Sequence, residues 1–99
     1  FKAWVAEDNT RIENNGGTAD AISSVTPCGY DAYMAAVNAI EAANSTEGPA
    51  IRDALASLNV PGLITGDLSF DENGDAVKTY AVIKTIKDGQ IVYFSTYNG

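Results

Sequence analysis

The stretch from Thr26 to Asn44, TPCGYDAYMAAVNAIEAAN, decides the fold, because the other segments must pack against it. Thr26 is suited to accept a hydrogen bond from a free backbone N–H at a helix start, and Pro27 fits the first helical turn. Apolar residues then recur at spacings of three and four, which predicts one helical face buried in a core: Tyr30, Tyr33, Met34, Ala36, Val37 and Ile40. The alanines allow another layer to approach closely, and Asn44 is expected to end the helix.

Composition limits the classes of protein to which the chain can belong. Its 99 residues, 45% of them apolar, indicate one small globular domain or a piece of a larger one. Thirteen acidic and six basic residues give a net charge of −7, which argues against binding to nucleic acid or to anionic lipid. No run is long and apolar enough to span a bilayer. The start at Phe1, with no initiator Met and no signal peptide, is expected of a processed product or an excised segment.

The residues of catalytic and metal chemistry are sparse. The chain has no histidine, the commonest general base and metal ligand. Its single cysteine, Cys28, rules out an internal disulfide and is expected to be buried in the first turn of the central helix. Ser23 and Ser24 have no activating base beside them, and adjacent carboxylates such as Glu7 and Asp8 point apart. These features predict no catalytic residues, no metal site and no cofactor, so the chain is not expected to be an enzyme.

Two further helices are predicted around the central one. Residues 1–14 form a short amphipathic pattern that the Asn-Asn-Gly-Gly run at 14–17 should end. Residues 18–25 are either a loop or a short extended lead-in. Pro49 is expected to open a helix that runs to about Leu58 and packs antiparallel to the central helix. Pro61-Gly62 then predicts a turn.

From Leu68 the apolar period changes to two, which predicts a short strand through Phe70. The run Asp71–Asp75 has the composition of a turn. Its first, third and fifth residues match a calcium loop, but Ala76 and Val82 stand where that loop needs glycine and glutamate. The turn is therefore preferred over a metal site.

The end of the chain predicts a β-hairpin. Strands over 77–87 and 90–96 flank Asp88-Gly89, the signal of a two-residue type I′ turn. Both strand faces carry apolar residues, so both are expected to be at least partly covered. Left bare, the hairpin over 77–96 is expected to promote self-association.

The order of these motifs resembles the C-terminal part of the periplasmic branched-chain amino-acid-binding proteins, the solute receptors of ABC transporters. The matching segments are GYDAYMAAVNAIEAANST, IRDALASL, GDLSFDENGDAV and YAVIKTIKDGQIV, which together cover nearly the whole chain. The Tyr30–Ala32 helix start, the Phe70–Gly74 turn and the Asp88-Gly89 hairpin come in the family's order. Phe1 and Trp4 stand in place of the family's phenylalanine and tyrosine.

The resemblance implies a two-lobed type I periplasmic binding fold of the α/β class, of which this chain, itself an α+β piece, is the last quarter to third. Residues 1–78 would belong to the N-terminal lobe, and the hairpin over 79–99 would join the other lobe. Ser24, Val25 and Thr26 would lie nearest the ligand, although the family often has an aromatic residue where Val25 stands. The groups that hold the ligand's ammonium and carboxylate would lie upstream.

The function implied is that of a periplasmic or extracellular receptor, soluble or anchored as a lipoprotein. Such a receptor binds branched-chain amino acids or similar solutes by hinge closure and delivers them to an ABC transporter permease. Two alternatives remain open. One is a stand-alone interaction module that pairs through its hairpin edge. The other is a sensor, regulator or enzyme built on the same fold.

Overall fold

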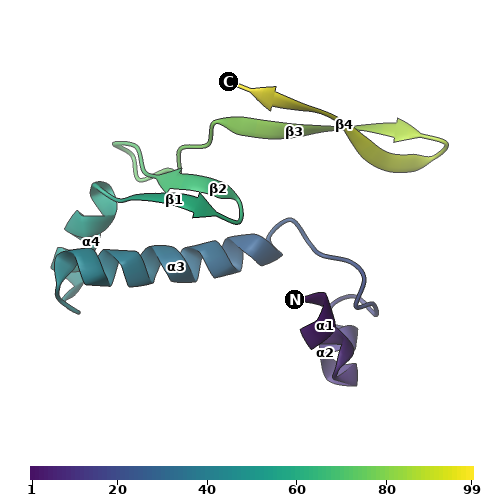
Figure 1. Cartoon of the computed structure of the whole chain (residues 1–99), viewed down its shortest axis with the longest axis horizontal. Helices are drawn as coiled ribbons and strands as arrows, with labels where there is room; N and C mark the ends of the chain where they lie inside the picture. The colour runs from purple at the N-terminus through teal and green to yellow at the C-terminus, as the bar shows by residue number, and fades with distance from the viewer.

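Helix α3 (Thr26–Ala43) is the longest element and forms the base of the central body (Figure 1). The computed structural model describes residues 1–99 as four helices and two separate two-stranded antiparallel sheets. The other elements, in chain order, are α1 (Lys2–Ala6), α2 (Asn9–Asn14), α4 (Gly48–Ala56), β1 (Asn59–Leu63), β2 (Gly66–Ser69), β3 (Tyr80–Lys87) and β4 (Gln90–Asn98). None of the helices has both the length and the apolar character needed to cross a bilayer.

The two ends of α3 follow local sequence signals. Pro27 lies in the first turn, and Asn44 ends the helix in the left-handed conformation at φ 47°, as predicted. The expected side-chain cap is absent, however. Val25 occupies the cap position and Thr26 is already helical, so the Thr26 hydroxyl accepts no hydrogen bond from a free N–H.

The buried face of α3 differs from the predicted one. Its buried residues are Asp31, Ala35 and Ala39, whereas Tyr33 is 68% exposed and Ile40 is 37% exposed. The small side chains allow neighbouring elements to approach the helix backbone closely, and this contact decides which face is covered. Of the larger apolar residues of the predicted face, Met34 and Val37 are half-buried, and Tyr30, Tyr33 and Ile40 are exposed. Cys28 is also exposed, contrary to the prediction of a buried thiol.

The core of the central body lies between α3, α4 and the β1–β2 hairpin. Ala35, Leu58, Val60 and Leu68 are buried together, with Leu55, Leu63 and Phe70 packed against them. Helix α4 packs beside α3 as predicted, but it ends at Ala56, so Leu58 reaches the core from the segment after the helix.

Strand β1 forms where the sequence predicted only a turn. Val60 pairs with Leu68 and Leu63 pairs with Gly66, and the register shift between these pairs takes up Pro61 and Gly62 as a bulge. Pro61-Gly62 therefore marks an irregularity inside a strand and not a chain reversal. Strand β2 confirms the predicted strand around Leu68.

The N-terminal segment is two short helices, not one. Asp8 breaks it by accepting hydrogen bonds from the N–H groups of Thr10 (2.8 Å) and Arg11 (3.1 Å), which makes it the cap of α2. The Arg11 guanidinium lies 4.2 Å from the Trp4 ring centroid and donates to the Trp4 carbonyl, so the two helices fold on each other. Val5 is buried between them.

The Asp71–Asp75 turn and the turn of the C-terminal hairpin agree with the sequence, but the first strand begins at Tyr80 instead of residue 77, and the second runs on to Asn98. The Asp71 carboxylate accepts the N–H groups of Asn73 and Asp75, both at 2.9 Å. Lys87 pairs with Gln90, and Asp88 (φ 52°) and Gly89 (φ 75°) both have the positive φ that a type I′ turn requires. Both faces of the hairpin were expected to be partly covered, but every residue of β3 is exposed in this chain.

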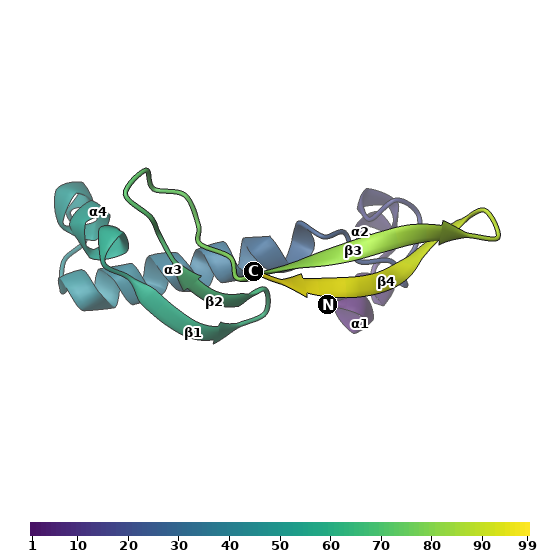
Figure 2. The same ribbon diagram turned by 90° about the horizontal axis from the view of Figure 1, so that it is seen from above.

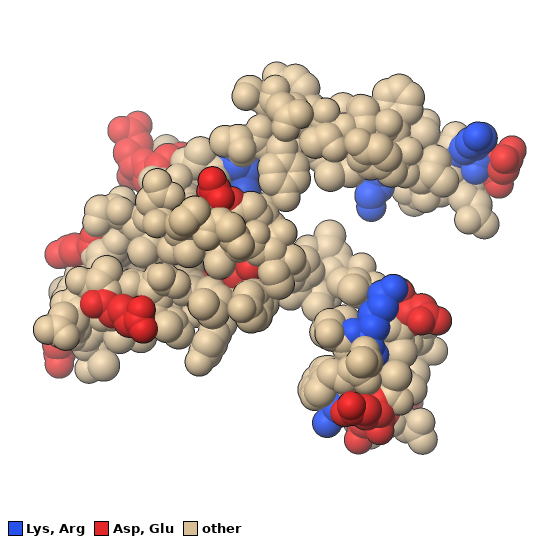
Figure 3. Space-filling view, in the orientation of Figure 1, with Lys and Arg blue, Asp and Glu red and all other residues tan.

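The molecule is extended. Its radius of gyration is 17.2 Å, against about 13 Å for a compact domain of 100 residues, and only 7 of its 99 residues are buried. The β3–β4 hairpin and the α1–α2 pair project from the same end of the body, and the space between them is open (Figures 1–3). The chain therefore has the form of a segment whose apolar surfaces are completed by other parts of a larger fold.

Candidate functional site

The predicted ligand residues lie where the chain enters α3. Ser24 and Val25 precede the helix and are exposed, with 69% of Val25 open to solvent, while Thr26 is the first helical residue and is half-buried. The Ser24 carbonyl accepts a weak hydrogen bond from the Cys28 thiol at 3.6 Å.

Thr26 lines an apolar depression, called here the α3 hollow. Its volume is about 440 Å³, which is within the usual range for small-molecule sites. The six residues around it are Phe1, Ile22, Thr26, Pro27, Tyr30 and Ile64. Of the three predicted ligand residues only Thr26 is among them, and the hydroxyls of Thr26 and Tyr30 are the polar side-chain groups. The hollow is therefore suited to a small, largely apolar group.

Asp31 fixes the side of the α3 hollow that Ile64 forms. Its carboxylate accepts the backbone N–H of Ile64 (3.1 Å), the N–H of Thr65 (2.8 Å) and the hydroxyl of Thr65 (2.6 Å). Asp31 is 5% exposed and follows Tyr30 directly on α3. The β1–β2 turn is thereby held against the same end of the helix that carries Thr26.

The chain crossing from the body to the hairpin is tied to the same turn. Lys78 Nζ donates to the hydroxyl (3.1 Å) and the carbonyl (3.3 Å) of Thr65. The Tyr80 hydroxyl donates to that carbonyl at 3.0 Å. Thr65 is thus the point at which α3, the β1–β2 turn and the base of the hairpin meet.

These contacts set the charge state of Asp31. Burial opposes its ionisation, but the hydrogen bonds from the Thr65 hydroxyl and from the N–H groups of Thr65 and Ile64 outweigh it, and the Lys78 charge adds to them. The pKa of Asp31 is therefore held below its ordinary value. The carboxylate is charged at neutral pH and keeps all its donors.

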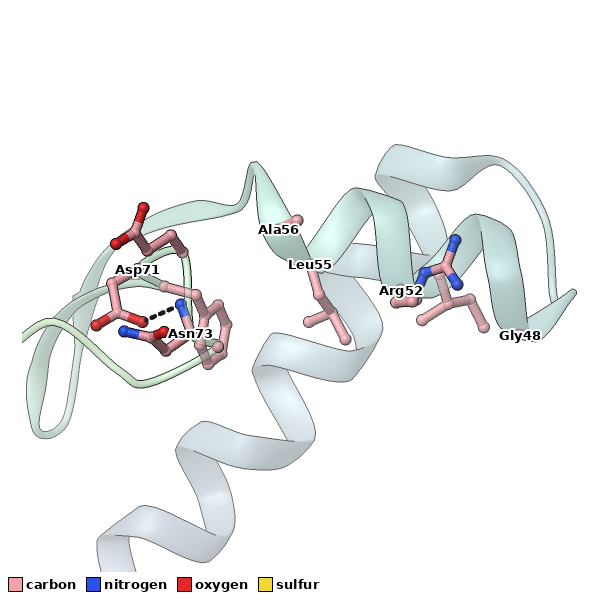
Figure 4. Close-up of a pocket in the computed structure, with 10 residues that line it drawn as sticks. Gly48, Arg52, Leu55, Ala56, Asp71 and Asn73 are labelled. Carbon is pink, nitrogen blue, oxygen red and sulfur yellow. Dashed lines mark hydrogen bonds between the residues drawn. The ribbon is translucent and has the colours of Figure 1, made fainter.

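A second depression, the α4 hollow, lies between α4 and the Asp71 turn, and its volume is about 530 Å³. Figure 4 shows Leu55 between the helix and the turn, and the hydrogen bond from Asn73 to Asp71. Three charged side chains line it, Arg52, Asp71 and Glu72. Arg52 pairs with Asp53 at 2.7 Å, and Asp71 accepts from its own turn. The α3 hollow, which the predicted ligand residue Thr26 lines, is the candidate ligand site.

The sequence reasoning missed Asp31, Ile64 and Thr65. The available signal was the spacing of Asp31, Ala35 and Ala39 at i, i+4 and i+8, which places a carboxylate on a small-residue face. Such a carboxylate is buried only with partners. Those partners lie 33 and 34 residues away in a turn, so no local pattern identified them.

Comparison with known proteins supports the resemblance. The model of the family described as "Receptor family ligand binding region" matches residues 2–88, which include every helix and strands β1 to β3. Members of this family are binding proteins or receptors, typically extracellular or periplasmic. No curated protein and no solved structure matches the chain significantly. The mixed helices and strands confirm the expected fold class, and the chain belongs to this receptor family as a segment of a type I periplasmic binding fold.

Proposed function

We propose that the chain provides one side of the ligand cleft in an extracytoplasmic solute-binding protein. Its ligand would be a branched-chain amino acid or a similar amino-acid-like solute, which the receptor delivers to the permease of an ABC transporter. Ser24, Val25 and Thr26 are the proposed ligand residues, with Thr26 making the direct contact. The protein acts by binding and carries out no catalysis.

The observation that supports this proposal best is the lining of the α3 hollow. It consists of apolar side chains with two hydroxyls and no charged side chain. A branched alkyl side chain loses water favourably in such a hollow, at roughly 25 cal/mol per Å² of apolar surface buried. The ammonium and carboxylate of an amino acid need charged or hydrogen-bonding partners, which parts of the receptor beyond this chain would supply.

The arrangement of the elements supports a division into two lobes. Residues 1–78 include the central body, and the hairpin over 79–99 leaves it with its strands uncovered. We propose that the hairpin joins the second lobe and that the crossing near Tyr80 belongs to the hinge. Closure of the two lobes would then exclude water from the ligand.

Calorimetric titration of the complete receptor with leucine, isoleucine and valine tests the proposal. Replacing Thr26 by Val keeps the side-chain shape and removes its hydroxyl, and should weaken binding about threefold to tenfold, the range for one neutral hydrogen bond. Thr46→Val is the matched control, because Thr46 is exposed in the α3–α4 connection. Absence of binding to all three amino acids contradicts the proposed ligand class.

A ligand sensor is the second candidate, because the matching family is described as receptors. Uptake of labelled leucine in cells with and without the protein separates the two candidates. Loss of uptake supports delivery to a permease. Unchanged uptake by a receptor that binds leucine supports a sensor instead.

A further inference from the structure

Tyr80, the first residue of β3, is seated on the β1–β2 turn. Its hydroxyl donates to the Thr65 carbonyl at 3.0 Å. Its ring covers Gly66, where a Cβ would lie only 3.1 Å from Tyr80 Cε1, and Gly66 has a φ of +98°. Both the backbone conformation and the ring contact therefore favour glycine at position 66. The turn is shaped to receive this aromatic ring.

Thr65 connects Tyr80 to the α3 hollow. Its hydroxyl donates to Asp31 Oδ2 and accepts from Lys78 Nζ, and its carbonyl accepts from both Lys78 and Tyr80. Its neighbour Ile64 is 63% exposed and lines the hollow. A displacement of Tyr80 therefore removes a support of the turn that carries Ile64.

We propose that Tyr80 is a positioning residue for the ligand site. It holds the Ile64–Gly66 turn in place from the hairpin side, while Asp31 holds it from the α3 side. The proposal rests on the function proposed above, because it assumes that the α3 hollow receives the ligand. It makes the fit of the hollow to the ligand depend on how the hairpin is placed.

Tyr80→Phe in the complete receptor tests this proposal, because it removes the hydroxyl and keeps the ring over Gly66. In calorimetry with leucine, isoleucine and valine, binding should weaken about threefold to tenfold, as expected for loss of one hydrogen bond. Tyr97→Phe is the matched control, since Tyr97 lies on the same hairpin and its hydroxyl, unlike that of Tyr80, is not bonded to Thr65. Its affinity should equal that of the unmodified receptor.

Two further readouts separate positioning from a general loss of stability. Tyr80→Phe should accelerate amide hydrogen exchange at Ile64 and Thr65 without ligand, whereas Tyr97→Phe should not. The effects of Ile64→Val and Tyr80→Phe on ligand affinity should be non-additive, because both act on one contact. Additive effects would indicate that Tyr80 acts elsewhere and would overturn the proposal.

The outcomes distinguish this proposal from the proposed function. If the receptor binds leucine and Tyr80→Phe leaves its affinity unchanged, the positioning role is wrong and the proposed function stands. If the receptor binds none of the three amino acids, the proposed function fails. In that case, amide hydrogen exchange at Ile64 and Thr65 decides whether Tyr80 holds the turn. Equal exchange rates in Tyr80→Phe and Tyr97→Phe overturn the positioning role as well.

Discussion

At the scale of single residues, Asp31 illustrates how a buried carboxylate is tolerated on a helix rich in alanine. Three donors from the β1–β2 turn replace the water that Asp31 loses. Lys78 in turn donates to the Thr65 hydroxyl, which is one of these donors. The same bonds join two segments more than 30 residues apart in the sequence. Asp31 therefore stabilises the body and shapes the α3 hollow at once.

The depressed pKa of Asp31 predicts a specific loss of stability in acid. A carboxyl whose pKa is lower in the folded than in the unfolded chain stabilises the fold at pH values above its ordinary pKa of 3.8. This contribution disappears as the pH falls through the folded-state pKa. Asp31→Asn should be less stable than the unmodified chain at pH 7, and the difference should shrink below about pH 4.

Denaturant unfolding of the unmodified chain and of Asp31→Asn between pH 7 and pH 2 measures the difference in their stability. Part of the acid sensitivity should persist in Asp31→Asn, because backbone hydrogen bonds from Arg11 and Thr10 also lower the pKa of Asp8. Glu41→Gln, an exposed carboxylate on the same helix, is the control. A stability difference for Asp31→Asn that stays constant with pH would show that its charge is not what the donors stabilise.

At the scale of elements, the close packing of α3 depends on its small residues. Ala39 is fully buried, whereas Ala36, one turn earlier on the same helix, is exposed. Ala39→Leu should lower the free energy of unfolding by about 1–3 kcal/mol, because the added methylenes have no space. Ala36→Leu should change it by less than about 0.5 kcal/mol. Chemical denaturation of the two variants measures both values, and equal losses would mean that the buried face is misassigned.

The elements with local signals were predictable from the sequence. Asp88-Gly89 specified the hairpin turn, Asn44 the end of α3, and the Asp71–Asp75 run its own turn. The break before α2 was missed because Asp8 acts as a cap within an apparently continuous amphipathic pattern. Strand β1 was not predictable, because Pro61-Gly62 is typical of a chain reversal and here forms a bulge inside a strand.

The buried face of α3 and most of the site were not predictable in this way. The predicted apolar stripe is only partly buried within these 99 residues, because Met34 and Val37 are half-buried and Tyr33 and Ile40 are exposed. Thr26 was predicted through the family resemblance and does line the α3 hollow. Ile64 lines the hollow from a turn that long-range bonds hold to Asp31, and periodicity does not encode such bonds.

At the scale of the whole molecule, the β3–β4 hairpin is the least supported part. A lone two-stranded hairpin is marginal in water, and this one exposes apolar residues on both faces and both edges of its sheet: Val82, Ile83, Ile86, Ile91, Tyr93 and Phe94. We expect the isolated chain to self-associate through residues 77–96, with the edge strands of two copies pairing. Sedimentation over a concentration series measures this. A strictly monomeric chain at high concentration would contradict it.

The most direct test of a ligand cleft with two sides is to titrate the isolated chain and the complete receptor in parallel with leucine, isoleucine and valine. The α3 hollow alone leaves both charged ends of an amino acid in water, so little free energy is gained over solvation. We predict measurable binding heat for the complete receptor and none for the isolated chain up to millimolar ligand. Micromolar binding by the isolated chain would contradict this account.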